Sequence, residues 1–323
     1  MLFIGGKNEL VKAMRDEASY DVIKIWLFAG SCILLAAVLS PFVWQGGLAL
    51  AEVSSNKETN GILSWLGELF QKATFTQVFQ ATLGVLVLLG LLPLIDVLRG
   101  YPRVGHGQFI VKNQAATSHL LLGFMGSCGL LGALSIGMMT LGHWHWNASL
   151  KLTVDFWFWA LSAAALSAVI QEGFFRGMAM GVFLRAMSPA AAWGMTAAFF
   201  ALCHFLVTRP AVCLLEPDGF SMGFTWLGSR IADFADWKIF LKEFMPTLLL
   251  GGLLGYARWR TASLMLPIGI HAGWLFASSV HARGVIEQPS NFPWLGYAAL
   301  VLTLAMALDF LPVRKPAHAA PKV

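Results

Sequence analysis

Glu172 and Arg176 stand four residues apart in the segment QEGFFRG, residues 171–177. Residues 156–170 before this segment and residues 178–184 after it carry no charge. Ionisable side chains in such apolar surroundings usually face a bundle interior or a polar cavity, and they indicate a functional site by default. Two residues four apart share one helical face and can pair. The pair therefore either neutralises a buried charge or takes part in chemistry.

Two histidines also lie in apolar stretches. His204 belongs to AAFFALCHFLV, residues 197–207, and His271 belongs to LMLPIGIHAGWLF, residues 264–276. A single histidine in a membrane helix is more often a packed, hydrogen-bonded residue than a catalyst. A carboxylate and two imidazoles at one depth would instead indicate a site for acid–base chemistry.

The composition places these residues in a membrane protein. Of the 323 residues 57% are hydrophobic and 12% are charged, and the mean hydropathy is +0.68. The net charge of +5 does not indicate nucleic-acid binding, because the basic residues are scattered between apolar segments. The four cysteines, Cys32, Cys128, Cys203 and Cys213, lack the spacing of a metal site.

The apolar segments predict an all-α, polytopic membrane helical bundle that forms a single integral domain over residues 1–323. About eight spans are expected, at 25–51, 76–98, 118–142, 153–184, 189–207, 239–257, 263–282 and 294–312. No short apolar region leads to a small-residue cleavage site near the N-terminus, so we expect no cleaved signal peptide.

Loop charges predict the orientation. With both termini in the cytoplasm, the inner loops hold more Lys and Arg than the outer loops. Counted at about 1.5 Å per residue from the cytoplasmic helix ends, Glu172 lies roughly 18–20 Å deep, His204 roughly 22 Å and His271 roughly 13 Å. We therefore expect the three side chains to line one cavity of an inner-membrane protein.

Small residues predict close helix contacts. Gly123, Gly126, Gly129 and Gly132 recur every three residues, and the pairs Gly177/Gly181 and Gly251/Gly255 are four apart.

The polar segment 208–238 is too polar to span. We expect a helix in the membrane interface there, with Phe224, Leu227, Ile231 and Phe234 on its apolar face and Ser229, Arg230, Asp233 and Asp236 opposite.

The order of these motifs resembles one protein family. QEGFFRG is similar to the EExxFRG motif of the CAAX-protease and bacteriocin-processing (CPBP, or Abi) intramembrane proteases, and Phe200-xxx-His204 is similar to their FxxxH motif. The stretch from Gly251 to His271 resembles their third block. The resemblance covers about residues 155–280, which we take as the family-like catalytic core.

The resemblance implies a metal-free endopeptidase in which a carboxylate and a histidine activate water. Glu172 would be the base, held ionised and oriented by Arg176; His204 would bind the water, and His271 would donate to the oxyanion. The substrate would be a membrane-associated, lipidated or exported peptide, and no cofactor is implied. Neither the substrate's identity nor the oligomeric state is legible from the sequence.

Two positions depart from the family pattern. Gln171 replaces the first glutamate of the motif, and Leu275 replaces an asparagine four residues after the last histidine. A glutamine amide cannot act as the base, so that role falls on Glu172 or is absent.

Three alternatives to the peptidase therefore stay open. The first is a catalytically silent member of the same fold that binds or escorts another membrane protein. The second is a zinc hydrolase that uses Glu172, His204 and His271, although no HExxH motif is present. A transporter is the third, and the lack of an obvious internal repeat argues against it.

Overall fold

Helices form nearly all of the described chain. The structure, a computed structural model, describes residues 4–56, 61–98, 115–148, 150, 153–208, 219–287, 301, 303–305 and 307–309. Within these residues the only sheet pairs β1 (Trp144–Trp146) with the antiparallel β2 (Val285–Glu287). The predicted all-α class is confirmed.

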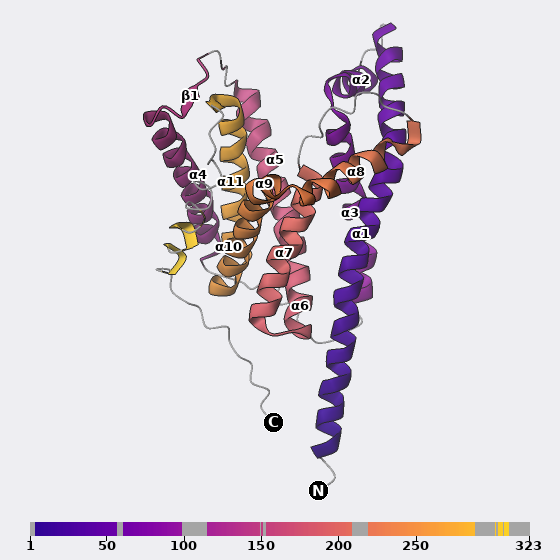
Figure 1. The fold of residues 1–323 in the computed structure, drawn as a ribbon, viewed down its shortest axis with the longest axis vertical. Helices are drawn as coiled ribbons and strands as arrows, with labels where there is room; N and C mark the ends of the chain where they lie inside the picture. The colour runs from indigo at the N-terminus through magenta and orange to yellow at the C-terminus, as the bar shows by residue number, and fades with distance from the viewer. Residues whose placement is uncertain are drawn as a thin grey trace. The chain divides into compact units, whose positions relative to one another are not determined.

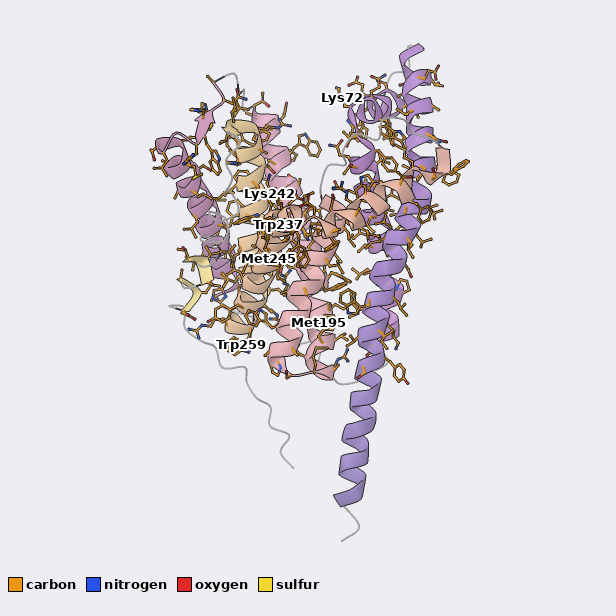
Figure 2. All side chains as sticks on the ribbon, viewed as in Figure 1. Lys72, Met195, Trp237, Lys242, Met245 and Trp259 are labelled. Carbon is orange, nitrogen blue, oxygen red and sulfur yellow. The ribbon has the colours of Figure 1, made fainter. Side chains whose placement is uncertain are left out.

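Six segments of the described residues are long and apolar enough to cross a membrane. They are Ser19–Ser54, Phe75–Leu94, Ala116–Thr140, Val154–Ala186, Pro189–Val207 and Trp237–Thr261. Large apolar side chains on these segments are exposed, among them Trp259 and Met195, which Figure 2 labels. The chain is therefore a polytopic membrane bundle, as predicted.

Two of the eight predicted spans are not among these six. The span predicted at 263–282 corresponds to α11 (Met265–Gly284), which is a helix of 20 residues. The span predicted at 294–312 lies mostly outside the described residues. A count of eight spans therefore stays a prediction.

The chain divides into two compact units. The first comprises Met1–Pro102 and Leu202–Phe240, and the second comprises Arg103–Ala201 and Leu241–Val323. The single integral domain expected from the sequence stays a prediction.

The first unit is built on a long helix, α1 (Ile4–Asn56), with α2 (Ile62–Lys72) and α3 (Phe75–Leu98) packed on it. The indole of Trp44 meets the ring of Phe75, with centroids 6.3 Å apart. A Cβ added to Gly90 would lie 2.6 Å from the ring of Phe28. Because the start of α3 lies beside the later part of α1, the two helices are antiparallel.

A short helix, α8 (Met222–Ala232), crosses α1 and α3 in the same unit. It follows the 3₁₀ turn Gly219–Ser221, and the turn Asp233–Ala235 and α9 (Trp237–Ile239) come after it. Its buried residues are Met222, Gly223, Trp226, Leu227 and Arg230, whereas Phe224 and Ile231 are exposed.

The exposure of Phe224 and Ile231 agrees with the predicted apolar face, whereas Leu227 of that face and Arg230 of the predicted polar face are both buried. Gly223 has no side chain and meets the backbone of Ala37 directly, and Trp226 Nε1 donates to Thr76 Oγ1 at 3.1 Å. These contacts turn Arg230 inward, where it pairs with Asp233 at 3.2 Å. Hydrophobic periodicity did not predict the burial of Arg230, because that burial depends on contacts of Gly223 and Trp226 with other helices.

In the second unit α11 lies between α4 (Ala116–Thr140) and α5 (Val154–Glu172), as Figure 1 shows. A Cβ on Gly123 would lie 2.7 Å from the backbone of Leu266 and Ile270. Gly269 and Gly273 likewise meet the backbone of α4. The predicted close contact is confirmed at Gly123.

The other glycines of that repeat behave differently. A Cβ at Gly126, Gly129 or Gly132 would meet no described atom within 4 Å, and the same holds at Gly181. The packing role predicted for these four glycines is therefore wrong within the described part of the chain.

The remaining helices of the second unit are α6 (Met180–Ala186), α7 (Pro189–Thr208, up to Ala201) and α10 (Met245–Thr261). Gly251 and Gly255 of α10 lie against α7, which confirms the contact predicted from their spacing. The π-helical turn Phe240–Phe244 precedes α10. Ala262, with a φ of 50°, ends α10 in the left-handed conformation, and the Ser263 hydroxyl accepts from Met265 N at the start of α11.

Candidate active site

Glu172 follows a row of alanines on one face of α5. Ala160, Ala164, Ala168 and Glu172 recur every four residues and are the buried residues of that helix. Ala168 packs against Ile268 and Ala272 of α11. Because alanine side chains are short, the two helices approach closely, and Glu172 at the end of the row comes within reach of α11.

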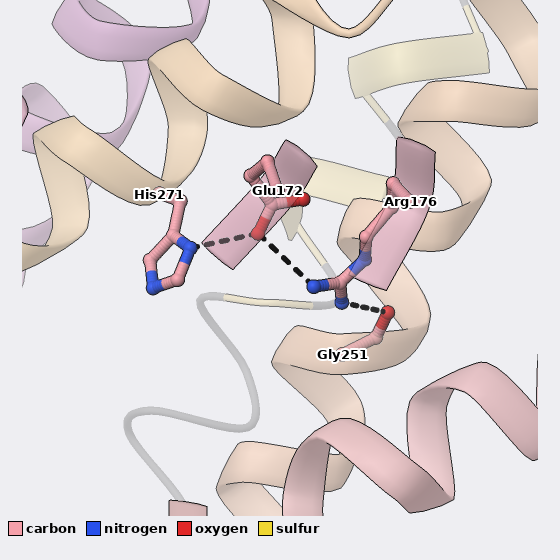
Figure 3. Close-up of polar contacts among 4 residues, drawn as sticks. All are labelled: Glu172, Arg176, Gly251 and His271. Atoms are coloured by element: carbon pink, nitrogen blue, oxygen red, sulfur yellow. Dashed lines mark hydrogen bonds and ion pairs between the residues drawn. The ribbon is translucent and has the colours of Figure 1, made fainter. Parts of the chain in front are cut away.

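Two donors share one oxygen of Glu172. The Oε1 atom accepts from Arg176 Nη1 at 3.0 Å and from His271 Nδ1 at 2.7 Å (Figure 3). An ionised carboxylate only accepts, so Nδ1 of His271 carries the proton in this contact. The other oxygen, Oε2, is buried and accepts no hydrogen bond from any described residue. All three side chains are at most 1% exposed.

Arg176 links three helices of the second unit. Its Nη1 bonds to Glu172, and its Nη2 donates to the carbonyl oxygen of Gly251 on α10 at 2.8 Å. Its guanidinium carbon lies 4.3 Å from the centroid of the Phe200 ring on α7. This guanidinium therefore has an anion, a carbonyl and an aromatic face around it, which suits a charge removed from water.

A π-helical segment, Gly173–Ala179, follows Glu172 directly and contains Arg176. Its residues Phe174 to Ala179 are all buried. Short π-helical turns within α-helices frequently occur at functional sites. The sequence predicted one helical span over residues 153–184. It did not predict the π-helical segment within that span.

Two glycines orient His271. Gly269 and Gly273 flank it by two residues on each side, and both meet α4. Two residues along an α-helix correspond to a rotation of about 200°, so the imidazole faces away from α4. It points instead to α5 and Glu172 (Figure 3).

The sequence also singled out Gln171, His204 and Leu275. Gln171 is half-buried, and its Oε1 accepts no hydrogen bond from a described residue. His204 belongs to the first unit, so its place beside Glu172 stays a prediction. Leu275 lies half-buried on α11, one turn after His271.

Two of the contact groups, the Phe200 ring and the Gly251 carbonyl, were not predicted as parts of the site. Both residues lie inside the family-like motifs, and this position was the signal that could have identified them as parts of the site. Among the described residues no three His, Cys, Asp or Glu side chains converge as metal ligands would.

Comparison with known proteins identifies the segment that carries this cluster. No curated protein and no solved structure matches the chain. A family model described as "Type II CAAX prenyl endopeptidase Rce1-like" matches residues 153–277, which include Glu172, Arg176, Phe200, His204 and His271. The match supports a CAAX-protease-like intramembrane peptidase in general. Residues 153–277 are therefore similar to the Rce1-like group, in agreement with the resemblance to the CPBP family that the motifs predicted.

Proposed function

We propose that the chain is an intramembrane endopeptidase that hydrolyses a peptide bond of a membrane-associated, lipidated or exported substrate. The observation that carries the proposal is the buried carboxylate of Glu172, whose Oε1 holds two donors while Oε2 accepts from no described residue. One oxygen is thus fixed, and the other has the lone pairs that a general base needs.

In this proposal Oε2 takes a proton from a water molecule as the water oxygen attacks the carbonyl carbon of the scissile bond. The carbonyl oxygen becomes the oxyanion of a tetrahedral intermediate. When the C–N bond breaks, the proton on Glu172 passes to the leaving nitrogen, which departs as an amine. The second water proton leaves with the new carboxyl group, so Glu172 returns to its ionised form.

The histidines assist in different ways. His271 donates from Nδ1 to Glu172, so a neutral ring has an acceptor at Nε2. Donation to the oxyanion, the role expected for His271, therefore requires the imidazolium, which donates from both nitrogens. His204 would bind the water. Arg176 pairs with Glu172 and fixes the rotamer of its carboxylate.

The burial of Glu172 and His271 has a consequence for substrate entry. Both side chains are at most 1% exposed, so a peptide reaches Oε2 only after the surrounding side chains move. We expect the binding of a peptide to open this cluster. Conformational steps of this kind limit the turnover of many enzymes.

The proposal is tested by comparing membranes that contain the wild type with membranes that contain Glu172→Gln. Mass spectrometry of new peptide termini should find cleavage products only with the wild type, and a metal chelator should not remove them. Identical termini in both samples contradict the proposal and favour the catalytically silent relative. Products lost on chelation favour the zinc hydrolase.

A further inference from the structure

The ring of Phe200 contacts both side chains that donate to Glu172, Arg176 and His271. Its centroid lies 4.3 Å from the guanidinium carbon of Arg176 and 5.6 Å from the centroid of the His271 ring. The Phe200 and His271 rings meet at 75°, so one presents its edge to the other. Phe200 itself is fully buried.

These contacts restrict both donors. A cation above an aromatic face is attracted by the ring's quadrupole, and an edge-to-face pair of rings has a preferred angle. Arg176 and His271 direct their N–H groups at the same oxygen of Glu172. A change in the position of the Phe200 ring therefore moves both donors together.

α10 confines the ring from another side. A Cβ on Gly251 would lie 3.0 Å from Cδ1 of Phe200 and 3.0 Å from the carbonyl oxygen of Ala197. Because glycine has no side chain, the Gly251 backbone comes this close, and the Gly251 carbonyl oxygen accepts a hydrogen bond from Arg176. Phe200 thus has neighbours on the π-helical segment Gly173–Ala179, on α10 and on α11.

We propose that Phe200 is a positioning residue that fixes Arg176 and His271 on Oε1 of Glu172 and so leaves Oε2 as the base. The effect of Phe200 on catalysis rests on the proposed peptidase function. Its effect on the positions of Arg176 and His271 does not need that function, so each effect has its own measurement.

The test compares Phe200→Leu with Phe199→Leu in the full-length protein. Phe199 is the matched control, because it is also fully buried on α7 but its ring contacts are with Phe174, Phe175 and Phe183. Thermal unfolding in detergent shows whether both variants fold. If Phe200→Leu does not fold, Phe200→Met, with a longer and more flexible side chain, takes its place.

The first readout does not need activity. Diethyl pyrocarbonate modifies unprotonated imidazoles, and mass spectrometry measures its reaction at His271. We expect Phe200→Leu to raise the initial rate of modification about fivefold, because the ring edge no longer holds the imidazole, and Phe199→Leu to leave it within about twofold. Equal rates in the wild type and Phe200→Leu overturn the positioning of His271, whether or not the protein cleaves a substrate.

The second readout is kinetic. Phe200→Leu should lower kcat by about tenfold or more at nearly constant KM, because the base is misplaced while the substrate still binds. Phe199→Leu should keep both constants. Equal losses in both variants mean that Phe200 acts only through general packing, which overturns the proposal. A wild type that cleaves nothing refutes the peptidase and leaves the His271 measurement to decide on the geometry.

Discussion

His271 Nδ1 lies 2.7 Å from Glu172 Oε1, although 99 positions separate the two residues in the chain. The alanine row of α5 and the glycines of α11 make this contact possible, because they bring both helices close to their neighbours. The hydrogen bond therefore depends on small residues that do no chemistry. Predictions about those residues test the site as directly as predictions about its polar groups.

The first prediction concerns Arg176. Arg176→Ala leaves Glu172 buried with one donor, and the loss of one partner from a buried ion pair typically costs about 3–5 kcal/mol. Expression and the unfolding temperature should fall together with activity. The double variant Glu172→Leu/Arg176→Leu should recover folding but not cleavage. If Arg176→Ala is as stable as the wild type and loses only activity, Arg176 contacts the substrate or the transition state instead.

The second prediction compares neighbouring glycines of α10. In Gly251→Ala the new Cβ would press on Ala197 and Phe200, and the carbonyl that receives Arg176 would shift. Activity and thermal stability should both decrease. In Gly252→Ala the Cβ meets only Trp193, at an ordinary 3.8 Å, and alanine favours the helix by roughly 0.5–1 kcal/mol. Equal unfolding temperatures for the two variants would contradict the close approach.

The third prediction tests the contact of α4 with α11. Gly273→Ala places a Cβ against the carbonyl of Phe124, so it should separate the helices and move His271. Gly126→Ala meets no described atom within 4 Å and should be tolerated. The yield of folded protein after detergent extraction measures both effects. A well-folded, fully active Gly273→Ala would contradict the role assigned to that glycine.

The fourth prediction places His204. If His204 lines a cavity with Glu172, cysteines in place of His204 and His271 should be joined by a short bifunctional thiol reagent. Cys203 is replaced first, since its side chain points about 100° away from position 204 on the helix. Water-soluble thiol reagents should label the new cysteines better from the cytoplasmic side. Failure to crosslink in a folded protein would remove His204 from the site.

The sequence predicted the helices and the polar residues of the second unit well. The absence of charged residues over 156–170 predicts a membrane helix, and the spacing of Glu172 and Arg176 predicts a pair on one helical face. The alanine row was missed, because alanine is common in membrane helices and only the position of α11 shows which face it serves. The π-helical segment was missed because its hydrogen-bond shift depends on neighbouring helices.

Tertiary contacts also explain the unpredicted burial of Arg230 on α8. Its sequence offers two apolar faces, and the periodicity favoured the one that contains Phe224 and Ile231. The structure buries Trp226 and Gly223 instead, because a large ring beside a glycine fits between α1 and α3. Sequence periodicity cannot rank two apolar faces where lipid covers one of them.

The central claim is that Glu172 is the base, and purified protein in lipid vesicles tests it most directly. With a substrate identified from the membrane comparison, Glu172→Gln should lower kcat by about 10²–10⁴-fold, because the amide keeps the shape of the side chain and lacks its basicity. Glu172→Gln should still fold, because the amide oxygen can accept from Arg176 and His271, but its unfolding temperature should fall because Arg176 loses its charge partner. Gln171→Glu should keep or raise activity. Full turnover by Glu172→Gln would contradict the account.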